Sequence, residues 1–412
     1  MTNVKKITQL MPQYMEKFKC IGSDCEDTCC AGWGITIDKK AYKKYKKCSQ
    51  SELKKEFDKN IVRNRKEPTD YSYAQFKLTE EGRCTFLTQD GWCNIHAKLG
   101  EEYLCNTCTG YPRKYSMVNG VIEKSGETSC PEVVRLALLN PAKMEFEQVE
   151  EEIDLEKVHG KIVNTNNHSC KNKEQKYFWE LRIFTIQVLQ AREYELWERL
   201  IILGNFYHGI EEIIQKNKIE EIPMLIEEYI EGIEKGIFDT LLEEIPVNEN
   251  IQIELLKEIM NKRTKKGFSN KRFIECHNEF VQELKQNDEN EIIKHYKEAY
   301  ELYYHPYMNK QEYILENYLV NYVFRLLFPF SKNKSLFEEY TLMIIHYALI
   351  KMYLVGMAAF HKNAFCTEYV VKLIQSFSKV VEHDQAFLGE IMEFLKENKY
   401  LTLTYLLLLI KN

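Results

Sequence analysis

Cysteine is the residue type whose number and spacing point most directly to chemistry in this chain. Of its 13 cysteines, 10 lie within the first 130 residues. Thiolates that converge on tight turns can hold a soft cation or an iron–sulfur core. We therefore predict a metal centre whose candidate ligands fall in a C-x4-C-x3-C-C run, a central pair and a C-x2-C pair: Cys20, Cys25, Cys29, Cys30, Cys84, Cys93, Cys105 and Cys108.

Two neighbouring residues are further candidates for this centre. Cys130 is a possible ninth thiol ligand, and His96 follows Cys93 by three residues and could supply a nitrogen. The alternative for His96 is a hydrogen-bonding side chain, and the alternative for the cysteines is a set of buried, reduced thiols. A zinc site of four thiolates would be closed and structural, whereas an iron–sulfur cluster would bring redox chemistry. The sequence leaves the choice between the two metals open.

The residues around these cysteines resemble a known family. The four-cysteine run, followed by C-x-F-L, C-x-I-H and C-x2-Y-P-R, is similar to the widespread CxxCxxCC zinc- or iron-chelating domain. Gly-Trp after the double cysteine, ETSCPEVVRLAL (127–138) and ENYLVNYVFRLLFPF (316–330) also resemble the flagellin lysine N-methylase family. The resemblance reaches both ends of the chain, while general helical character covers the middle.

This resemblance implies a protein-lysine N-methyltransferase. The expected reaction moves a methyl group from S-adenosylmethionine to surface lysines of flagellin and depends on an iron–sulfur cluster, expected as 4Fe-4S, with zinc as the alternative. The N-terminal cysteines would hold that cluster. The alternative function is a non-catalytic zinc-binding module that binds a protein partner.

Lysine methylation by nucleophilic displacement needs a neutral amine aligned with the methyl group. A Tyr, Asn or Glu near the amine could accept its proton or orient it. The candidates for this role are Tyr111, Tyr115, Glu316, Asn317 and Asn321. For each of them the alternative is a role in the core or in capping.

Several common catalytic patterns are missing from the sequence. It has no G-x-G-x-x-G loop after a strand, so an ordinary nucleotide-binding methyltransferase fold is not expected. It has C-x3-C-C at Cys25, Cys29 and Cys30 in place of the C-x3-C-x2-C triplet of standard radical S-adenosylmethionine enzymes. G-x-S-x-G, H-E-x-x-H and Walker motifs are also absent, which removes support for hydrolase, zinc-protease and P-loop functions.

The pattern of the chain predicts a mainly α protein with two domains. Residues 1–140 should form a Cys-rich, loop-rich metal-binding domain, in which WGITI (33–37) reads as a strand and Asp38 as the N-cap of a helix. Residues 141–173 are polar and predict a connector. Residues 174–412 have apolar residues at three- and four-residue intervals, which predicts a larger all-α domain. The first stretch with this helical periodicity is 177–215. Further helices are expected at roughly 220–235, 250–265, 271–303, 309–328, 334–361, 367–381, 384–396 and 399–410.

The net charge and the hydropathy pattern argue against nucleic acid and membranes as binding partners. The net charge of -6 argues against a nucleic-acid-binding protein, although the first 140 residues are basic and the remainder acidic. The apolar stretch 342–360 contains His346 and Lys351, which favours a buried helix over a membrane span. The N-terminus lacks a secretory apolar region, and crowded thiols suit a reducing compartment, so we expect a cytoplasmic protein without membrane or nucleic-acid partners.

Overall fold

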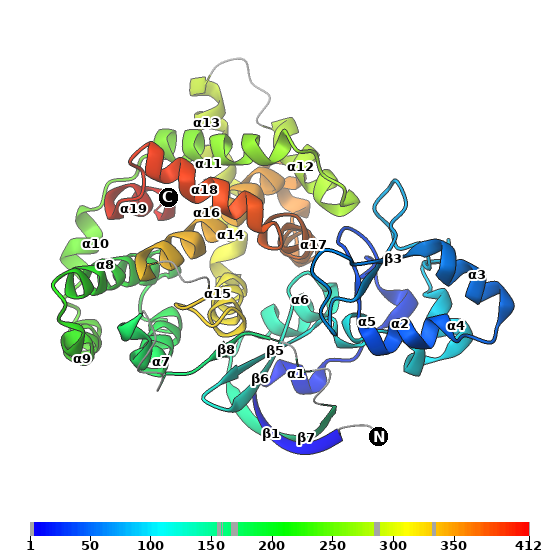
Figure 1. Ribbon diagram of the computed structural model, residues 1–412. Coiled ribbons are helices and arrows are strands. Elements are labelled where there is room, and N and C mark those ends of the chain that lie inside the picture. Colours follow the sequence, from blue (N-terminus) through cyan, green and yellow to red (C-terminus); the bar gives the residue numbers. More distant parts are fainter. Residues whose placement is uncertain are drawn as a thin grey trace.

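The structure divides into a mixed α/β N-terminal part and a larger helical C-terminal part (Figure 1). The computed structural model describes residues 4–154, 158, 160–165, 172–283, 289–331 and 335–411. The helical expectation is confirmed for the C-terminal part. The N-terminal part differs from the expected loop-rich domain because it contains two β-sheets.

The larger sheet has five strands in the spatial order β7-β1-β6-β5-β8. β1 runs parallel to β6 and antiparallel to β7, whereas β5 and β6 form an antiparallel hairpin. In chain order the strands are β1 (Val4–Pro12), β5 (Arg113–Val118), β6 (Val121–Gly126), β7 (Phe146–Asp154) and β8 (Ile162–Val163). The hairpin turns at Asn119 and Gly120, whose φ angles of 50° and 85° are those of a tight two-residue turn.

β7 and β8 lie in the stretch 141–173 that the sequence analysis treats as a connector. β7 pairs with β1 along its whole length, from Val4 opposite Asp154 to Pro12 opposite Phe146. Its many glutamates hide it from hydropathy, although Phe146 and Val149 of this strand pack against the main core. Charge pairing across the strands adds to that packing. Lys6 and Glu150, for example, form an ion pair of 2.5 Å on this edge.

The smaller sheet, in the order β2-β4-β3, belongs to a compact Cys-rich unit. Its elements are β2 (Thr36–Ile37), α2 (Lys39–Lys46), α3 (Ser51–Asn60), β3 (Ile61–Arg63), β4 (Ala74–Phe76), α4 (Asn94–Leu99), η2 (Glu101–Tyr103) and α5 (Asn106–Gly110). The expected strand near 33–37 is present in part. The expected N-cap is confirmed, because the Asp38 side chain accepts a hydrogen bond of 2.8 Å from the Ala41 N–H. Tyr45 stacks on Phe57 at 4.4 Å between ring centroids in a small core of its own.

The short helices α1 (Tyr14–Lys17) and η1 (Gly22–Asp24) lie between β1 and β2 and so connect the two sheets. A further helix, α6 (Pro131–Leu138), connects β6 to β7 within the larger sheet. The helical part then follows, with η4 (Lys173–Tyr177), α7 (Phe178–Leu189), α8 (Leu196–Gln215), η5 (Ile219–Glu221), α9 (Ile222–Glu234), α10 (Asp239–Glu244), α11 (Glu249–Thr264), α12 (Lys271–Glu283), α13 (Glu289–Ala299), η6 (Tyr300–Tyr304), α14 (His305–Met308), η7 (Asn309–Gln311), α15 (Tyr313–Arg325), α16 (Leu336–His361), η8 (Lys362–Ala364), α17 (Thr367–Phe377), η9 (Ser378–Glu382), α18 (Gln385–Glu397) and α19 (Leu403–Ile410). The expected helices have counterparts here, although the first periodic stretch divides into α7 and α8. The expected helix 271–303 corresponds to α12, α13 and most of η6, and its residues 284–288 lie outside the described residues.

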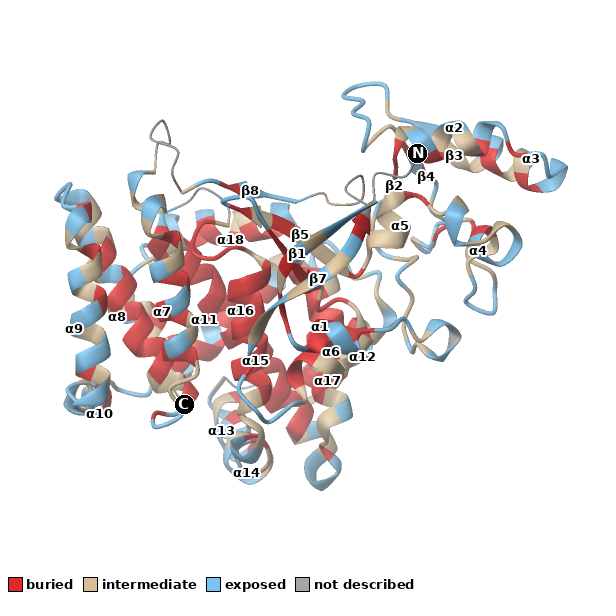
Figure 2. Ribbon diagram, turned by 90° about the horizontal axis from the view of Figure 1, so that it is seen from below, coloured by how far each residue is buried: buried red, intermediate tan, exposed pale blue. Residues whose placement is uncertain are grey.

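α16 is the central helix of the helical part and is buried nearly all round (Figure 2). Among the described residues, one helical stretch, Leu336–Ala364, is long and apolar enough to cross a membrane. Of the window that qualifies, 94% is buried inside the protein. The expectation of a buried helix for 342–360 is therefore confirmed.

The main hydrophobic core extends across both parts of the chain. It contains Met11 of β1, Val118 of β5 and Val133 of α6 together with the apolar faces of the C-terminal helices. The five-stranded sheet is therefore packed against the helical part, and α15 contacts both α6 and β6. The compact Cys-rich unit keeps its separate small core. The domain boundaries at 140 and 173 stay a prediction.

Candidate functional site

Six of the predicted metal ligands lie near one another in the Cys-rich unit: Cys29, Cys30, Cys84, Cys93, Cys105 and Cys108. The Sγ atoms of Cys105 and Cys108 are 3.5 Å apart, and those of Cys29 and Cys30 are 4.0 Å apart. Burial, together with the neighbouring thiols of Cys93 and Cys105, raises the pKa of Cys84 to about 11. Without a cation the Cys84 thiol favours the protonated form, and a bound metal ion would reverse that preference.

Turns and helix starts hold these thiols in place. The Cys84 N–H donates to the Cys30 carbonyl at 2.7 Å, which joins the first and second cysteine groups. An isolated β-bridge between Leu87 and Cys93 closes the loop that separates Cys84 from Cys93. Cys105 is the N-cap of α5, and Cys108 follows on the same short helix. Residues distant in sequence are therefore brought together by local backbone geometry.

The remaining two predicted ligands, Cys20 and Cys25, form a second group of thiols together with Cys130. Burial, followed by the thiols of Cys25 and Cys20, raises the pKa of Cys130 to about 12. Cys130 is the N-cap of α6, so this group lies where the Cys-rich run meets the main core. Cys48 is buried in the small core, and His96 is exposed on α4.

The donor chemistry of these residues fits a thiolate-bound metal. Soft thiolates select zinc or iron–sulfur clusters, and the Cys105–Cys108 separation is that of neighbouring ligands. Within the described residues, however, no three or more His, Cys, Asp or Glu side chains are grouped so that they could hold a metal ion. The metal centre and its ligand set stay predictions.

A short loop between β6 and α6 joins the two parts of the chain. Its residues Glu127, Thr128 and Ser129 each bond to the C-terminal helices. Arg325 of α15 donates to Glu127 at 2.5 Å, and Ser378 donates to Thr128 at 2.9 Å. Ser129 Oγ lies 2.9 Å from His383 Nε2. The loop is thus fixed by side chains that come from beyond residue 320.

The cysteine-run loop bonds to the same helices. Asp27 accepts from Gln375 at 2.6 Å and from Lys379 at 2.8 Å. Lys379 also donates to the Thr28 carbonyl at 2.7 Å, directly before the double cysteine. We call the meeting of the three segments 25–30, 127–130 and 375–383 the junction.

The C-terminal side of the junction has an unusual backbone. α17 passes into η9, a π-helix over Ser378–Glu382. Single-turn π-helices are rare and occur frequently at functional sites, because the wider turn redirects side chains. Here the turn carries Ser378, Lys379 and Glu382, which all bond within the junction.

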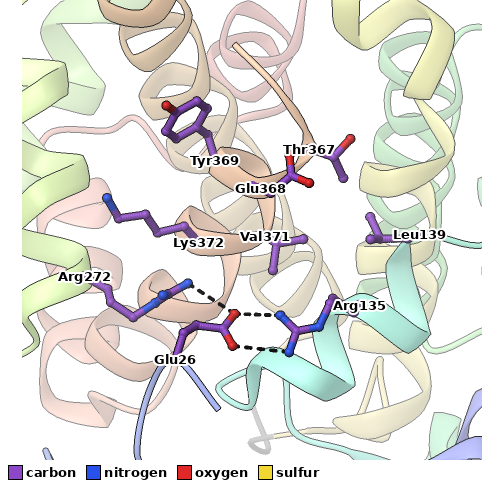
Figure 3. A pocket seen from close by; sticks show the side chains of 9 residues that line it. All are labelled: Glu26, Arg135, Leu139, Arg272, Thr367, Glu368, Tyr369, Val371 and Lys372. Atoms are coloured by element: carbon purple, nitrogen blue, oxygen red, sulfur yellow. Dashed lines mark hydrogen bonds and ion pairs between the residues drawn. The ribbon is translucent and has the colours of Figure 1, made fainter. Parts of the chain in front are cut away.

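Beside the junction lies a half-open cavity of about 320 Å³. Figure 3 shows the Glu26 carboxylate between the guanidinium groups of Arg135 and Arg272. Arg135 bonds both carboxylate oxygens, at 2.6 and 3.3 Å. Although burial acts to raise it, the hydrogen bonds from Arg135 hold the pKa of Glu26 below its usual range. The lining from α6, α12, α17 and the cysteine run combines charged side chains, such as Lys372 and Glu368 on α17, with apolar surface from Leu139 and Val371.

Tyr111 is the one catalytic candidate that lies beside the clustered thiols. Its hydroxyl is 3.0 Å from Ser129 Oγ, and its ring lies 5.8 Å from that of Trp33. Trp33 is held by a 2.8 Å hydrogen bond from its indole N–H to the Cys29 carbonyl. Burial, followed by the nearby thiol of Cys130, raises the pKa of Tyr111 well above its usual value.

The other catalytic candidates lie elsewhere. Glu316 is buried between Arg192 and Arg199, with bonds of 2.8 and 2.7 Å. Asn317 donates to the Asn140 carbonyl at 2.9 Å, and Asn321 accepts from the Tyr14 hydroxyl at 2.7 Å. Asn317 and Asn321 therefore join α15 to the N-terminal part, whereas Glu316 joins α15 to the α7–α8 segment. None of the three side chains lines the cavity beside the junction.

Tyr115, the remaining candidate, is in the middle of β5 and is partly buried. Burial raises its pKa above the usual value. Its assignment, like those of Glu316, Asn317 and Asn321, stays a prediction.

Sequence reasoning missed the polar residues of the junction, among them Asp27, Ser129, Lys379 and His383. The available signal was the density of polar residues in ETSC (127–130) and SKVVEHD (378–384). Neither stretch indicates its partner, because the contacts cross about 250 residues of sequence.

Comparison with known proteins identifies the family to which this chain belongs. Residues 182–409 match the FliB lysine N-methylase C-terminal domain. This match covers most of the helical part, and the chain belongs to the FliB lysine N-methylase family. That homology supports a protein-lysine methyltransferase.

Individual relatives match over a shorter stretch. The chain is 32% identical over 142 residues to the flagellar biosynthetic protein FliU of Salmonella muenchen, which is 34% of this chain and 83% of that protein. It is also 32% identical over 142 residues to the lysine-N-methylase of Salmonella typhimurium, where the match spans 35% of the relative. The lysine-N-methylase of Salmonella choleraesuis matches to the same extent. No solved structure matches the chain.

Proposed function

We propose that this protein transfers methyl groups from S-adenosylmethionine to the ε-amines of flagellin lysines. The observation that carries this proposal is the match of residues 182–409 to the lysine N-methylase domain. The name of FliU links a relative to flagellar biosynthesis, and two other relatives are named lysine-N-methylases. Flagellin is therefore the substrate to test first.

The reaction would take place at the junction. The junction joins the family-matched helices to the cysteine run, and a cavity of about 320 Å³ opens beside it. Cavities of roughly this size and larger hold cofactor-sized ligands. When bound, S-adenosylmethionine supplies an electrophilic methyl group on a sulfonium centre. The chain's own residues must then keep the lysine amine neutral and aligned.

We also propose that the N-terminal cysteines hold an iron–sulfur cluster, with zinc as the alternative metal. The six neighbouring thiols supply the donor type that both metals select. When bound, an iron–sulfur cluster supplies redox chemistry, whereas zinc supplies structure. Both the thiols and the methyl donor suit the reducing cytoplasm, which we propose as the location.

Co-expression with flagellin tests the activity. Mass spectrometry of the flagellin should find lysines heavier by one methylene unit per transfer, and these should be absent when the methylase is not expressed. Purified protein, S-adenosylmethionine and flagellin should reproduce the same products. Unmodified flagellin in both experiments would overturn the proposed function.

Metal analysis under anaerobic purification tests the cofactor separately. Iron and sulfide in the protein, with visible absorbance, support the cluster. Zinc without iron would overturn the iron–sulfur proposal and leave the methyl transfer to be judged by the flagellin products.

A further inference from the structure

Three side chains form a continuous hydrogen-bonded line across the junction. The Tyr111 hydroxyl lies 3.0 Å from Ser129 Oγ, and Ser129 Oγ lies 2.9 Å from His383 Nε2. Tyr111 comes from the Cys-rich unit, Ser129 from the loop before α6, and His383 from the end of η9. Three separate segments thus contribute one group each.

The line leads from the interior to solvent. Tyr111 is partly buried beside the thiols, Ser129 is 2% exposed, and His383 is exposed. Its middle is rigid, because the Ser129 carbonyl accepts a 2.9 Å hydrogen bond from Gln375. A buried hydroxyl between a phenol and an exposed imidazole is an arrangement through which a proton can pass without any large movement.

The donors and acceptors along the line favour one direction. A serine hydroxyl has a single hydrogen to donate. When Tyr111 donates to Ser129, Ser129 can donate to the unprotonated Nε2 of His383. The line then carries a proton away from Tyr111 and toward solvent.

The surroundings of His383 keep its imidazole available as an acceptor. Two carboxylates, Glu127 and Glu382, and two cations, Lys114 and Arg325, face it. Desolvation of the ring on the side that packs against the junction, together with the cations, lowers the pKa of His383, while the carboxylates act to raise it, and the net direction is downward from the usual 6.5. The neutral ring therefore predominates at neutral pH.

The other end of the line can receive a lysine. Trp33 and Tyr111 are both partly exposed, and their rings are 5.8 Å apart with a tilt of 34°. Aromatic faces attract ammonium groups, most strongly where water is excluded. An ammonium held against this pair would lie beside the Tyr111 hydroxyl.

We propose that Tyr111, Ser129 and His383 form a proton relay that removes the proton from the substrate lysine and delivers it to solvent. The inference rests on the proposed function. The lysine N–H bond breaks as its proton moves to the Tyr111 oxygen, the Tyr111 proton moves to Ser129 Oγ, and the Ser129 proton moves to His383 Nε2. No group is oxidised or reduced, and His383 returns to neutral by releasing a proton to water. Tyr111 contacts the substrate, whereas Ser129 and His383 act through it.

Three variants test the relay in the full-length, metal-loaded protein. Tyr111→Phe keeps the ring against Trp33, Ser129→Ala removes the hydroxyl, and His383→Gln removes the imidazole. Each should lower kcat for flagellin methylation by about 100-fold, the usual scale for general acid–base catalysis. KM, melting temperature and metal content should stay near those of the wild type. His208→Gln, which replaces an exposed histidine of α8, is the matched control and should methylate at the wild-type rate.

The pH profile separates a relay from a structural role. Wild-type activity should fall on acidification as His383 becomes protonated, and His383→Gln should lose this dependence. NMR titration of His383 should give a midpoint below 6.5 that coincides with the fall in activity. Added imidazole should restore His383→Ala but not Ser129→Ala, because the hydroxyl link is still missing in the second variant.

Two results would overturn the relay. The first is wild-type rates in Ser129→Ala and His383→Gln, and the second is an unchanged pH profile in His383→Gln. Either result leaves the methyl transfer itself intact, since the wild-type protein would still modify flagellin. A wild-type protein that methylates nothing refutes the proposed function and the relay that rests on it.

Discussion

The buried carboxylate of Glu382 gives the sharpest prediction for stability. It accepts hydrogen bonds of 2.5 Å from Arg325 and Tyr318 and one of 3.0 Å from Ser378. Its side chain is 3% exposed. Replacing it by Gln in Glu382→Gln keeps the shape but removes the charge that pairs with a buried guanidinium.

The size of the effect follows from the carboxyl pKa. Although burial acts to raise it, Arg325 and the Tyr318 hydroxyl lower the pKa of Glu382 from 4.5 to about 2. A difference of this size corresponds to about 3 kcal/mol of folding free energy at neutral pH. Breaking a buried ion pair by removing one partner also costs roughly 3–5 kcal/mol. We expect Glu382→Gln to lose about 3 kcal/mol of unfolding free energy at pH 7.

The sign of the pH dependence is fixed by the direction of the shift. A carboxyl with a lowered pKa in the folded state contributes its full stability above the unfolded value of 4.5. That contribution disappears as the pH falls from 4.5 toward 2. The difference between the wild type and Glu382→Gln should therefore be constant near neutral pH and shrink below pH 4.5.

Urea denaturation at several pH values measures this difference. Glu212→Gln is the matched control, because Glu212 forms an exposed pair with Lys216 at 3.0 Å and should leave the midpoint unchanged. Equal unfolding free energies for the wild type and Glu382→Gln at pH 7 would refute the argument. A difference that does not shrink in acid would assign the loss to packing and not to the charge.

Three further changes have defined outcomes. Cys84→Ser should greatly reduce bound metal while Cys276→Ser, in the helical core, leaves it intact; equal loss measured by elemental analysis would contradict the predicted ligand set. Burial lowers the pKa of Lys351 from 10.5 to about 7, so wild-type stability should rise between pH 7 and 10, and Lys351→Met should abolish that rise in thermal melts. Asn321→Ala removes the acceptor of the Tyr14 hydroxyl and should cost about 1–3 kcal/mol of unfolding free energy; a normal melting temperature with lost methylation would instead place Asn321 in the reaction.

The fold could be predicted well where a single periodic pattern sets the structure. Helices such as α8, α11 and α18 follow from apolar residues at three- and four-residue intervals, and Asp38 marks the start of α2. The burial of α16 follows from the apolar stretch 342–360 and from His346 and Lys351 within it, which disfavour a membrane. Strand β7 could not be predicted in this way, because its acidic residues are stabilised by a partner strand more than 130 residues away.

The candidate site also has one part that the sequence predicts and one part that depends on tertiary structure. Cysteine spacing alone indicated a thiol-rich site, since metal-binding chemistry depends on residue type and local turns. The alignment of Tyr111 with Ser129 and His383 depends on tertiary structure, as do the partners of Glu316 and Asn321 inside the core. A polar side chain in a sequence offers its hydrogen bond to many possible partners. Only the packing of the helices against the five-stranded sheet decides which partner it meets, because burial removes water as the alternative.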